Sequence, residues 1–235
     1  MDKQNKPPQI YKWVIAGLLF VALTMPVLAA TLVIDGQFGD WAGQPNVQDD
    51  NDGGNPNVDI LTFYWGTNPG DDHIYWMMER EGVSSGNPKV YYFVSLDTNN
   101  NDSFTDAQDR LVQVLYDPSR NASEVTVTIF DGTGGQISQS SGDWGESTNE
   151  GGSRVEWRAS FVDLGIDAHQ TLNMTAAAGQ NPGQSDGDQV PDNGDITWTP
   201  IPVLGWPWLV AIVVAVIATA WYTRGRFKWR QTSSS

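Results

Sequence analysis

The amino-acid sequence predicts an all-β ectodomain, a jelly-roll-like β-sandwich, followed by a single transmembrane helix. Apolar and polar residues alternate at a period of two through the middle of the chain, and Asn, Asp, Gly and Pro clusters separate these runs. Two long apolar segments lie near the chain ends. The middle, residues 31–200, carries 27 acidic and 6 basic side chains. This layout is typical of an exported domain that stays tethered to a membrane.

Residues 1–30 have the layout of a signal peptide. A basic stretch with three lysines precedes the apolar run Trp13–Met25, and Pro26 then leads into small residues that end at Ala29 and Ala30. Signal peptidase requires small side chains near the bond that it cuts, so we expect cleavage after one of these two alanines. An uncleaved signal anchor is the alternative.

Six longer runs and three of four shorter ones predict the strands of an ectodomain at residues 31–178, and the fourth shorter run lies beyond it. The longer runs are Leu61–Trp65, His73–Met78, Lys89–Leu96, Leu111–Tyr116, Glu124–Phe130 and Arg154–Phe161. The shorter runs are Leu32–Ile34, Gln136–Ser138, Leu172–Ala177 and Ile196–Thr199. Residues 179–202 are acidic and rich in Gly and Pro, which indicates a loop or stalk that also holds the last strand.

Residues 203–223 are uncharged and apolar on all sides, and they match the roughly 20 residues that cross a membrane as a helix. Trp and Tyr residues lie near both ends of this segment, where an aromatic belt would place them. The basic tail, residues 224–235, is expected to stay in the cytoplasm by the positive-inside rule. The ectodomain would therefore lie outside the cell.

Composition narrows the partners of the ectodomain. Its strong negative charge argues against nucleic acid and against anionic lipid surfaces. The chain has no Cys, which excludes disulfide bonds and a lipoprotein anchor. Extracellular glycans or envelope components remain as partners.

The C-terminal segment resembles the tripartite sorting signals of prokaryotic surface proteins. Ile201-Pro202-Val203-Leu204 precedes the apolar span and the basic cluster, and it is most similar to tails that begin with Ile-Pro-Thr-Leu. Val203 departs from that pattern. The resemblance implies recognition by a membrane sorting peptidase and possible removal of the tail; because the motif is short, a permanent anchor is the favoured interpretation.

The ectodomain resembles secreted β-sandwich domains of carbohydrate-binding module family nine and the DOMON group. The resemblance spans residues 31–200 and is carried by Ile34-Asp35-Gly36, Asp40-Trp41, Glu156-Trp157 and Asp163-Leu164-Gly165. It implies the fold without identifying sugar-stacking positions.

Some DOMON-related domains bind haem through Met and His, which would implicate Met77 or Met78 together with His169. A core Met and a surface His are the ordinary alternative.

The segment Asp97–Asp109 resembles the calcium loops of EF-hands and dockerins. Oxygen ligands at alternate positions of a tight loop converge on one point, and Ca²⁺ accepts six to eight such oxygens. The predicted ligands are Asp97, Asn99, Asn101, Ser103, Asp106 and Asp109. Asp102 replaces the usual turn Gly, and Gln108 takes the place of the closing Glu. The alternative is an Asn/Asp-rich turn without an ion.

Other carboxylates suggest weaker hypotheses. The acidic stretch Asp49–Asp52, near Asp59, is either a second metal cluster or a solvated loop. A glycosidase needs two facing carboxyl groups, for which Glu156 and Glu79 are the candidates in strands. Surface charge on the polar face of a strand is the alternative for both residues.

Six tryptophans lie in the ectodomain, and an exposed indole face can stack on a sugar ring. Trp144 lies in a Gly-rich segment and is the predicted ligand-binding residue. Trp41, Trp65, Trp76 and Trp157 are expected inside the fold.

We therefore expect a surface-displayed, non-catalytic domain that binds extracellular carbohydrate or envelope glycan and holds a structural Ca²⁺. A structural or adhesive surface protein is the runner-up, and a glycoside-active enzyme is third. A groove with two exposed Trp or Tyr faces would favour binding. Paired inward carboxylates in a cleft would favour an enzyme.

Overall fold

The computed structural model describes residues 30–52, 55–82, 89–119, 124–146, 152–183, 187–200 and 216–217. The signal-peptide, membrane-helix, sorting-signal and cytoplasmic-tail predictions lie almost entirely outside these residues. Within the described part of the chain, no helix has the length and apolar character needed to cross a membrane.

Two antiparallel sheets make up the described domain, which confirms the all-β prediction. The smaller sheet has the order β1 (Asn46–Gln48), β2 (Ile60–Gly66), β3 (His73–Arg80), β8 (Arg154–Ser160). The larger sheet has the order β10 (Asp188–Val190), β9 (Leu172–Gly179), β4 (Val90–Asp97), β5 (Arg110–Tyr116), β6 (Val125–Asp131), β7 (Gln136–Asp143), and β11 (Ile196–Trp198) also pairs with β9. Two short helical elements accompany the described strands of the two sheets, η1 (Phe38–Trp41) and α2 (Phe161–Leu164).

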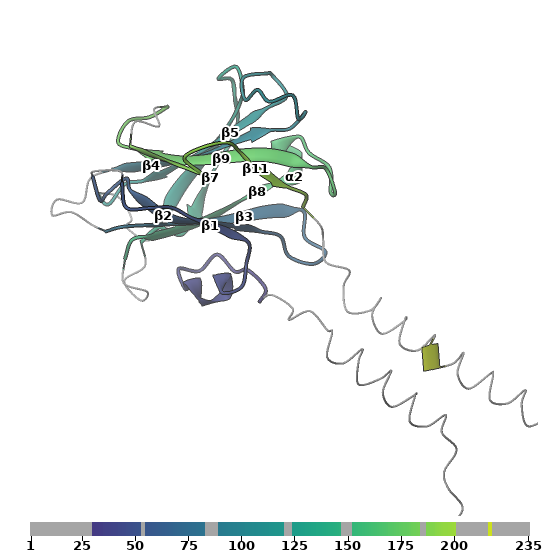
Figure 1. Cartoon of the computed structure of the whole chain (residues 1–235), viewed down its shortest axis with the longest axis horizontal. Helices are drawn as coiled ribbons and strands as arrows, with labels where there is room; N and C mark the ends of the chain where they lie inside the picture. Colours follow the sequence, from purple (N-terminus) through teal and green to yellow (C-terminus); the bar gives the residue numbers. More distant parts are fainter. Residues whose placement is uncertain are drawn as a thin grey trace, which may run out of the picture. The chain divides into compact units, whose positions relative to one another are not determined.

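The sheets form two layers, with β2 and β3 in one and β4, β5 and β9 in the other (Figure 1). The main core lies between them, because alternate residues of both sheets point inward. Trp157 links the layers: its ring lies 6.1 Å from that of Trp76 within the smaller sheet and 6.5 Å from that of Tyr92 in the larger one. The arrangement is consistent with a β-sandwich.

A second apolar cluster covers the outer face of the smaller sheet. Leu32, Phe38 and Trp41 of the N-terminal segment pack on Tyr75 and Met77 of β3. The sequence predicts a strand at 32–34, but no strand forms there. The Asn68 side chain instead accepts from the Leu32 N–H at 2.8 Å and donates to its carbonyl at 2.9 Å. One amide side chain thus satisfies the backbone groups that a strand partner would otherwise bind.

All six longer predicted strands are present, with ends that differ by one or two residues. The run predicted at Gln136–Ser138 is much longer, since β7 continues to Asp143. β1 and β10 were not predicted, and β10 lies in the stretch for which the sequence predicts a loop or stalk. It pairs with β9, so this part of the chain returns to the larger sheet.

Candidate functional site

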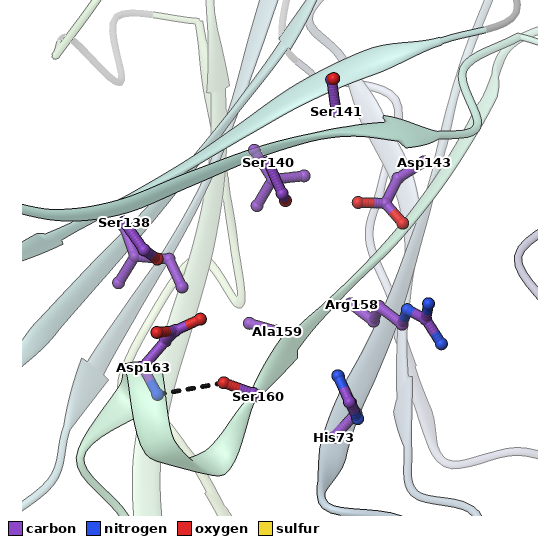
Figure 2. A pocket seen from close by; sticks show the side chains of 11 residues that line it. His73, Ser138, Ser140, Ser141, Asp143, Arg158, Ala159, Ser160 and Asp163 are labelled. Carbon is purple, nitrogen blue, oxygen red and sulfur yellow. Dashed lines mark hydrogen bonds between the residues drawn. The ribbon is translucent and has the colours of Figure 1, made fainter.

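A polar pocket lies where the open edges of the two sheets approach each other. β7 ends the larger sheet and β8 ends the smaller one. Backbone hydrogen bonds of 3.1 and 2.8 Å between Trp144 and Glu156 join the two edges at one point. The pocket has a cavity volume of about 220 Å³. Its polar lining residues are His73, Ser138, Ser140, Ser141, Asp143, Arg158, Ser160 and Asp163 (Figure 2).

Asp143, the last residue of β7, is the most enclosed charged group of the pocket, with 8% of its surface exposed. No described residue forms a hydrogen bond with its carboxyl group. Burial raises the pKa of this carboxyl to about 6, although the charges of Arg158 and His73 act in the opposite direction. The Asp143 oxygens are not among the fully enclosed side-chain atoms that lack a partner, so they are open to the pocket, where water or a ligand can donate to them.

Arg158 brings positive charge to the same pocket. Its guanidinium is held by the Tyr75 hydroxyl oxygen, and this hydrogen bond raises the pKa of Arg158. The Tyr75 O–H in turn donates to the Asp71 carboxylate. In the close view, Arg158 and Asp143 lie on one side of the pocket, whereas Ser138 and Asp163 lie on the other (Figure 2).

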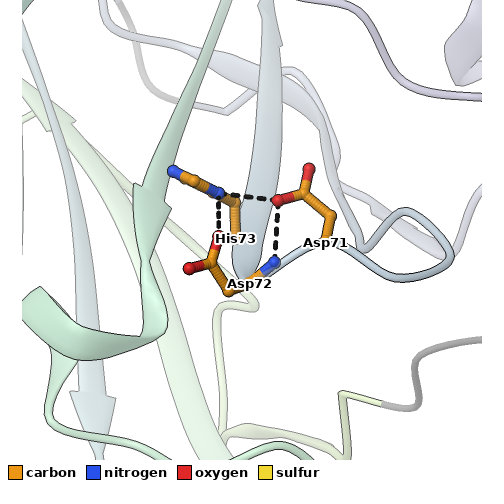
Figure 3. Close-up of side chains that lie close together, drawn as sticks. All are labelled: Asp71, Asp72 and His73. Carbon is orange, nitrogen blue, oxygen red and sulfur yellow. Dashed lines mark hydrogen bonds and ion pairs between the residues drawn. The ribbon is translucent and has the colours of Figure 1, made fainter.

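His73, the first residue of β3, joins the pocket to a small acidic cluster. Its Nδ1 lies 2.7 Å from Asp71 Oδ1 and 2.8 Å from Asp72 Oδ1. Because carboxylates only accept, Nδ1 carries the hydrogen, and the other ring nitrogen points away from both carboxylates (Figure 3). These three residues have the spacing of a metal site, but the ion pairs already account for their positions.

A second group with metal-ligand spacing is formed by Asp49, Asp188 and Asp192. Burial and the charges of Asp188 and Asp192 raise the pKa of Asp49 to about 6. Asp188 Oδ2 also accepts from the Ile60 N–H at 2.7 Å, which ties the start of β2 to β10. Asp50 and Asp52, which the sequence places in the acidic cluster, are exposed.

The predicted calcium loop connects β4 to β5 and has two buried carboxylates at its base. Asp97 and Asp109 are fully buried. The Asp97 carboxylate accepts the N–H groups of Asn101 at 3.3 Å and Asp102 at 2.9 Å. Asp109 accepts those of Thr98 at 3.2 Å and Asp106 at 2.8 Å. These four bonds shape the loop from within.

Side chains of the same loop gather around Asp106. Its Oδ2 accepts from Nδ2 of Asn101 at 2.5 Å and of Asn99 at 3.3 Å, and these bonds lower its pKa. Ser103 donates its N–H to Asn101 Oδ1 at 3.0 Å. Asp102 has φ of 63°, so this residue adopts the left-handed backbone that the usual glycine would supply. Among the described residues, the carboxylates of this loop do not form a group with metal-ligand spacing, so calcium remains a prediction.

Trp144, the predicted ligand-binding residue, is half-buried and does not line the pocket. It follows Asp143 directly and is fixed by the backbone bridge to Glu156. Trp41, Trp65, Trp76 and Trp157 are buried, as predicted.

The burial of Met77, Met78 and His169 bears on the haem hypothesis. Met77 and Met78 are buried in the two apolar clusters, and His169 is exposed. The positions match the ordinary alternative of core methionines and a surface histidine.

Glu156 is not a surface charge, and this part of the prediction is wrong. The side chain is fully buried and accepts from Asp35 N–H, Gly36 N–H and Trp41 Nε1. Glu79 pairs with Arg154 at 3.1 Å instead of facing Glu156 across a cleft. Neither residue lines the pocket.

Sequence reasoning missed Asp143 and Arg158 as site residues. There was no clear signal in the sequence, because the segment from Ser138 to Asp143 contains no apolar side chain to mark the strand that continues there. Comparison of the chain with protein-family models, with curated proteins and with solved structures gives no match.

Proposed function

We propose that this protein is a surface-displayed, non-catalytic domain that binds extracellular carbohydrate or envelope glycan in the pocket between β7 and β8. The observation that carries the proposal is the Asp143 side chain, which is 8% exposed, lines a polar pocket and forms no hydrogen bond through its carboxyl group with the described residues. Sugars offer dense hydroxyl donors of the kind that such an acceptor needs. Four serine hydroxyls, Arg158 and Asp163 add further polar partners around the same volume.

The proposal includes export and membrane anchoring. The basic stretch, the apolar run and the small residues that end at Ala29 and Ala30 support removal of residues 1–30. The apolar segment 203–223 and the basic tail support an anchor with the domain outside, with a sorting peptidase as a partner of the tail. The jelly-roll-like sandwich and a structural Ca²⁺ at Asp97–Asp109 complete the proposal.

A glycan array probed with the purified full chain in detergent tests the function. We expect binding to a restricted set of glycans, at least tenfold weaker in Asp143→Asn. The control is Asp167→Asn, which makes the same charge change at an exposed site outside the pocket. Trp144→Ala measures whether the neighbouring indole adds stacking. An array without any signal would favour the structural or adhesive role instead.

One observation favours a glycoside-active enzyme as the second candidate. Asp143 and Asp163 both line the pocket, and no Trp, Tyr or Phe ring is among its described lining residues. Two carboxyl groups in one pocket can act as acid and base toward a glycosidic bond. Release of reducing sugar from a bound glycan, lost in Asp143→Asn and in Asp163→Asn, would establish catalysis. Unchanged glycan after long incubation would leave binding as the function.

A further inference from the structure

We infer that the pocket takes one neutral sugar unit, at a chain end or a branch tip, and recognises two adjacent hydroxyl groups of that unit through Asp143 and Arg158. This inference rests on the proposed function and names the class of ligand. It depends on the size, charge and lining of the pocket.

Size limits the ligand to about one ring. Pockets for larger organic ligands usually hold about 300–1,000 Å³. The pocket here holds about 220 Å³ and lies between two strand edges that meet at Trp144 and Glu156. The bridge follows Asp143 directly in the chain, so the two strand edges converge at that end and leave less room for a polysaccharide to continue. A terminal or branching unit fits such a narrow end.

The polar groups select paired hydroxyls. Asp143 supplies acceptor oxygens that no described residue satisfies, and Arg158, an exposed lining residue whose guanidinium points away from Ser138 and Ser140, supplies N–H donors at the rim (Figure 2). Each hydroxyl of a sugar both donates and accepts. Two neighbouring hydroxyls can therefore donate to Asp143 and accept from Arg158, in a geometry that depends on their orientation.

Charge disfavours ionised sugars. A carboxylated sugar would place a third negative group near Asp143 and Asp163, in a domain with a large excess of acidic residues. A cationic amino sugar would be attracted by these two carboxylates but would also meet the Arg158 guanidinium. A neutral sugar avoids both repulsions and still satisfies the hydrogen-bonding groups.

The lining also predicts how specificity arises. Without an aromatic platform among the described lining residues, the ligand is held by hydrogen bonds, so the loss of one hydroxyl removes a large share of the affinity. This differs from stacking, which depends little on the orientation of individual hydroxyls.

Calorimetric titration of the full chain in detergent with methyl glycosides tests the inference. The panel contains neutral hexoses and pentoses, their monodeoxy analogues, and the corresponding uronic acids and amino sugars. We expect a neutral glycoside to bind and two adjacent monodeoxy analogues to bind at least tenfold more weakly. Asp143→Asn and Arg158→Lys should each lower affinity at least tenfold, since Lys keeps the charge and loses the planar fork. Asp167→Asn is the control.

Three results would overturn the inference: tighter binding of a uronic acid, affinity that ignores both pocket variants, or glycans that bind only through internal units. Tighter binding of a uronic acid, or binding only through internal units, would leave the proposed function standing, whereas affinity that ignores both pocket variants would also reject the pocket between β7 and β8 as its site. Absence of binding to every array glycan would instead reject the proposed function together with the inference.

Discussion

The indole Nε1 of Trp41 donates a 2.9 Å hydrogen bond to Oε2 of Glu156, across 115 positions of sequence. The other carboxylate oxygen, Oε1, accepts the backbone N–H groups of Asp35 at 2.8 Å and Gly36 at 2.7 Å. One buried side chain of β8 therefore holds the N-terminal segment against the outer face of the smaller sheet. This contact gives a physical reason for an Asp-Gly, an Asp-Trp and a Glu-Trp to occur together in one domain.

Replacing Glu156 with Ala should lower the free energy of unfolding by about 3 kcal/mol. Three donors that are now satisfied would lose their acceptor in a buried site, where each unpaired group costs about 1–3 kcal/mol before relaxation. Urea unfolding followed by Trp fluorescence measures the change. Glu81→Ala is the matched control, because Glu81 is exposed and should cost less than about 0.5 kcal/mol. Equal losses in the two variants would show that the Glu156 contacts do not stabilise the fold.

Stability should rise as the pH falls from about 8 to about 5. Burial raises the pKa of Glu156 to about 7 and those of Asp143 and Asp49 to about 6. The folded state therefore binds more protons than the unfolded state in this range, and stability falls as pH rises through 6 and 7. Asp117 has the opposite effect on stability. Hydrogen bonds from Lys89 and Ser119 lower its pKa to about 2, so the stability that it adds to the folded state is lost as the pH falls toward that value.

Melting temperatures measured between pH 3 and pH 9 check this prediction. The melting temperature should be highest near pH 4–5. Glu156→Gln should flatten the slope between pH 6 and pH 8, since it removes the group with the highest of these pKa values. A melting temperature that increases steadily from pH 5 to pH 8 would contradict the assignment of raised pKa values.

The strands could be predicted because their signal is local. Inward residues of β4 and β5 alternate with outward ones, and this alternation is visible in the sequence. The pocket could not be predicted, because it depends on which strands end the sheets. Asp143 and Arg158 come from edge strands whose proximity follows from sheet order, a long-range property. Glu156 shows the same limit: its strand was predicted, but its burial depends on a segment more than a hundred residues away.

Calcium should raise the melting temperature of the chain if the Asp97–Asp109 loop binds the ion. A ligand that binds only the folded state stabilises it by about 2.7 kcal/mol at a hundredfold excess over Kd. We expect a shift of several degrees with Ca²⁺, reversed by EDTA and absent in Asp106→Asn. Asp106 suits this test because it is only partly buried, so its substitution should leave the ion-free protein folded. A melting temperature indifferent to Ca²⁺ and EDTA would establish the ion-free turn, which the backbone bonds to Asp97 and Asp109 already support.

Glu146→Gln should cost about 3 kcal/mol of stability, because it leaves the Arg80 guanidinium buried without a counter-ion. The two side chains form an ion pair and are 0% and 5% exposed. Arg80 also donates to the carbonyl oxygens of Asn57 at 2.9 Å and Gly82 at 3.2 Å, so it cannot turn toward solvent without breaking further bonds.

The matched control for this ion pair is Glu79→Gln. Glu79 pairs with Arg154 at 3.1 Å, but both side chains are more than a quarter exposed, so water screens the interaction and the expected loss is below about 1 kcal/mol. Urea unfolding at low and high salt separates the two pairs further, since added salt should weaken only the exposed one. Similar losses for the two substitutions, with similar salt dependence, would mean that water reaches Arg80 and that the buried pair does not fix the Asn57 and Gly82 turns to the end of β3.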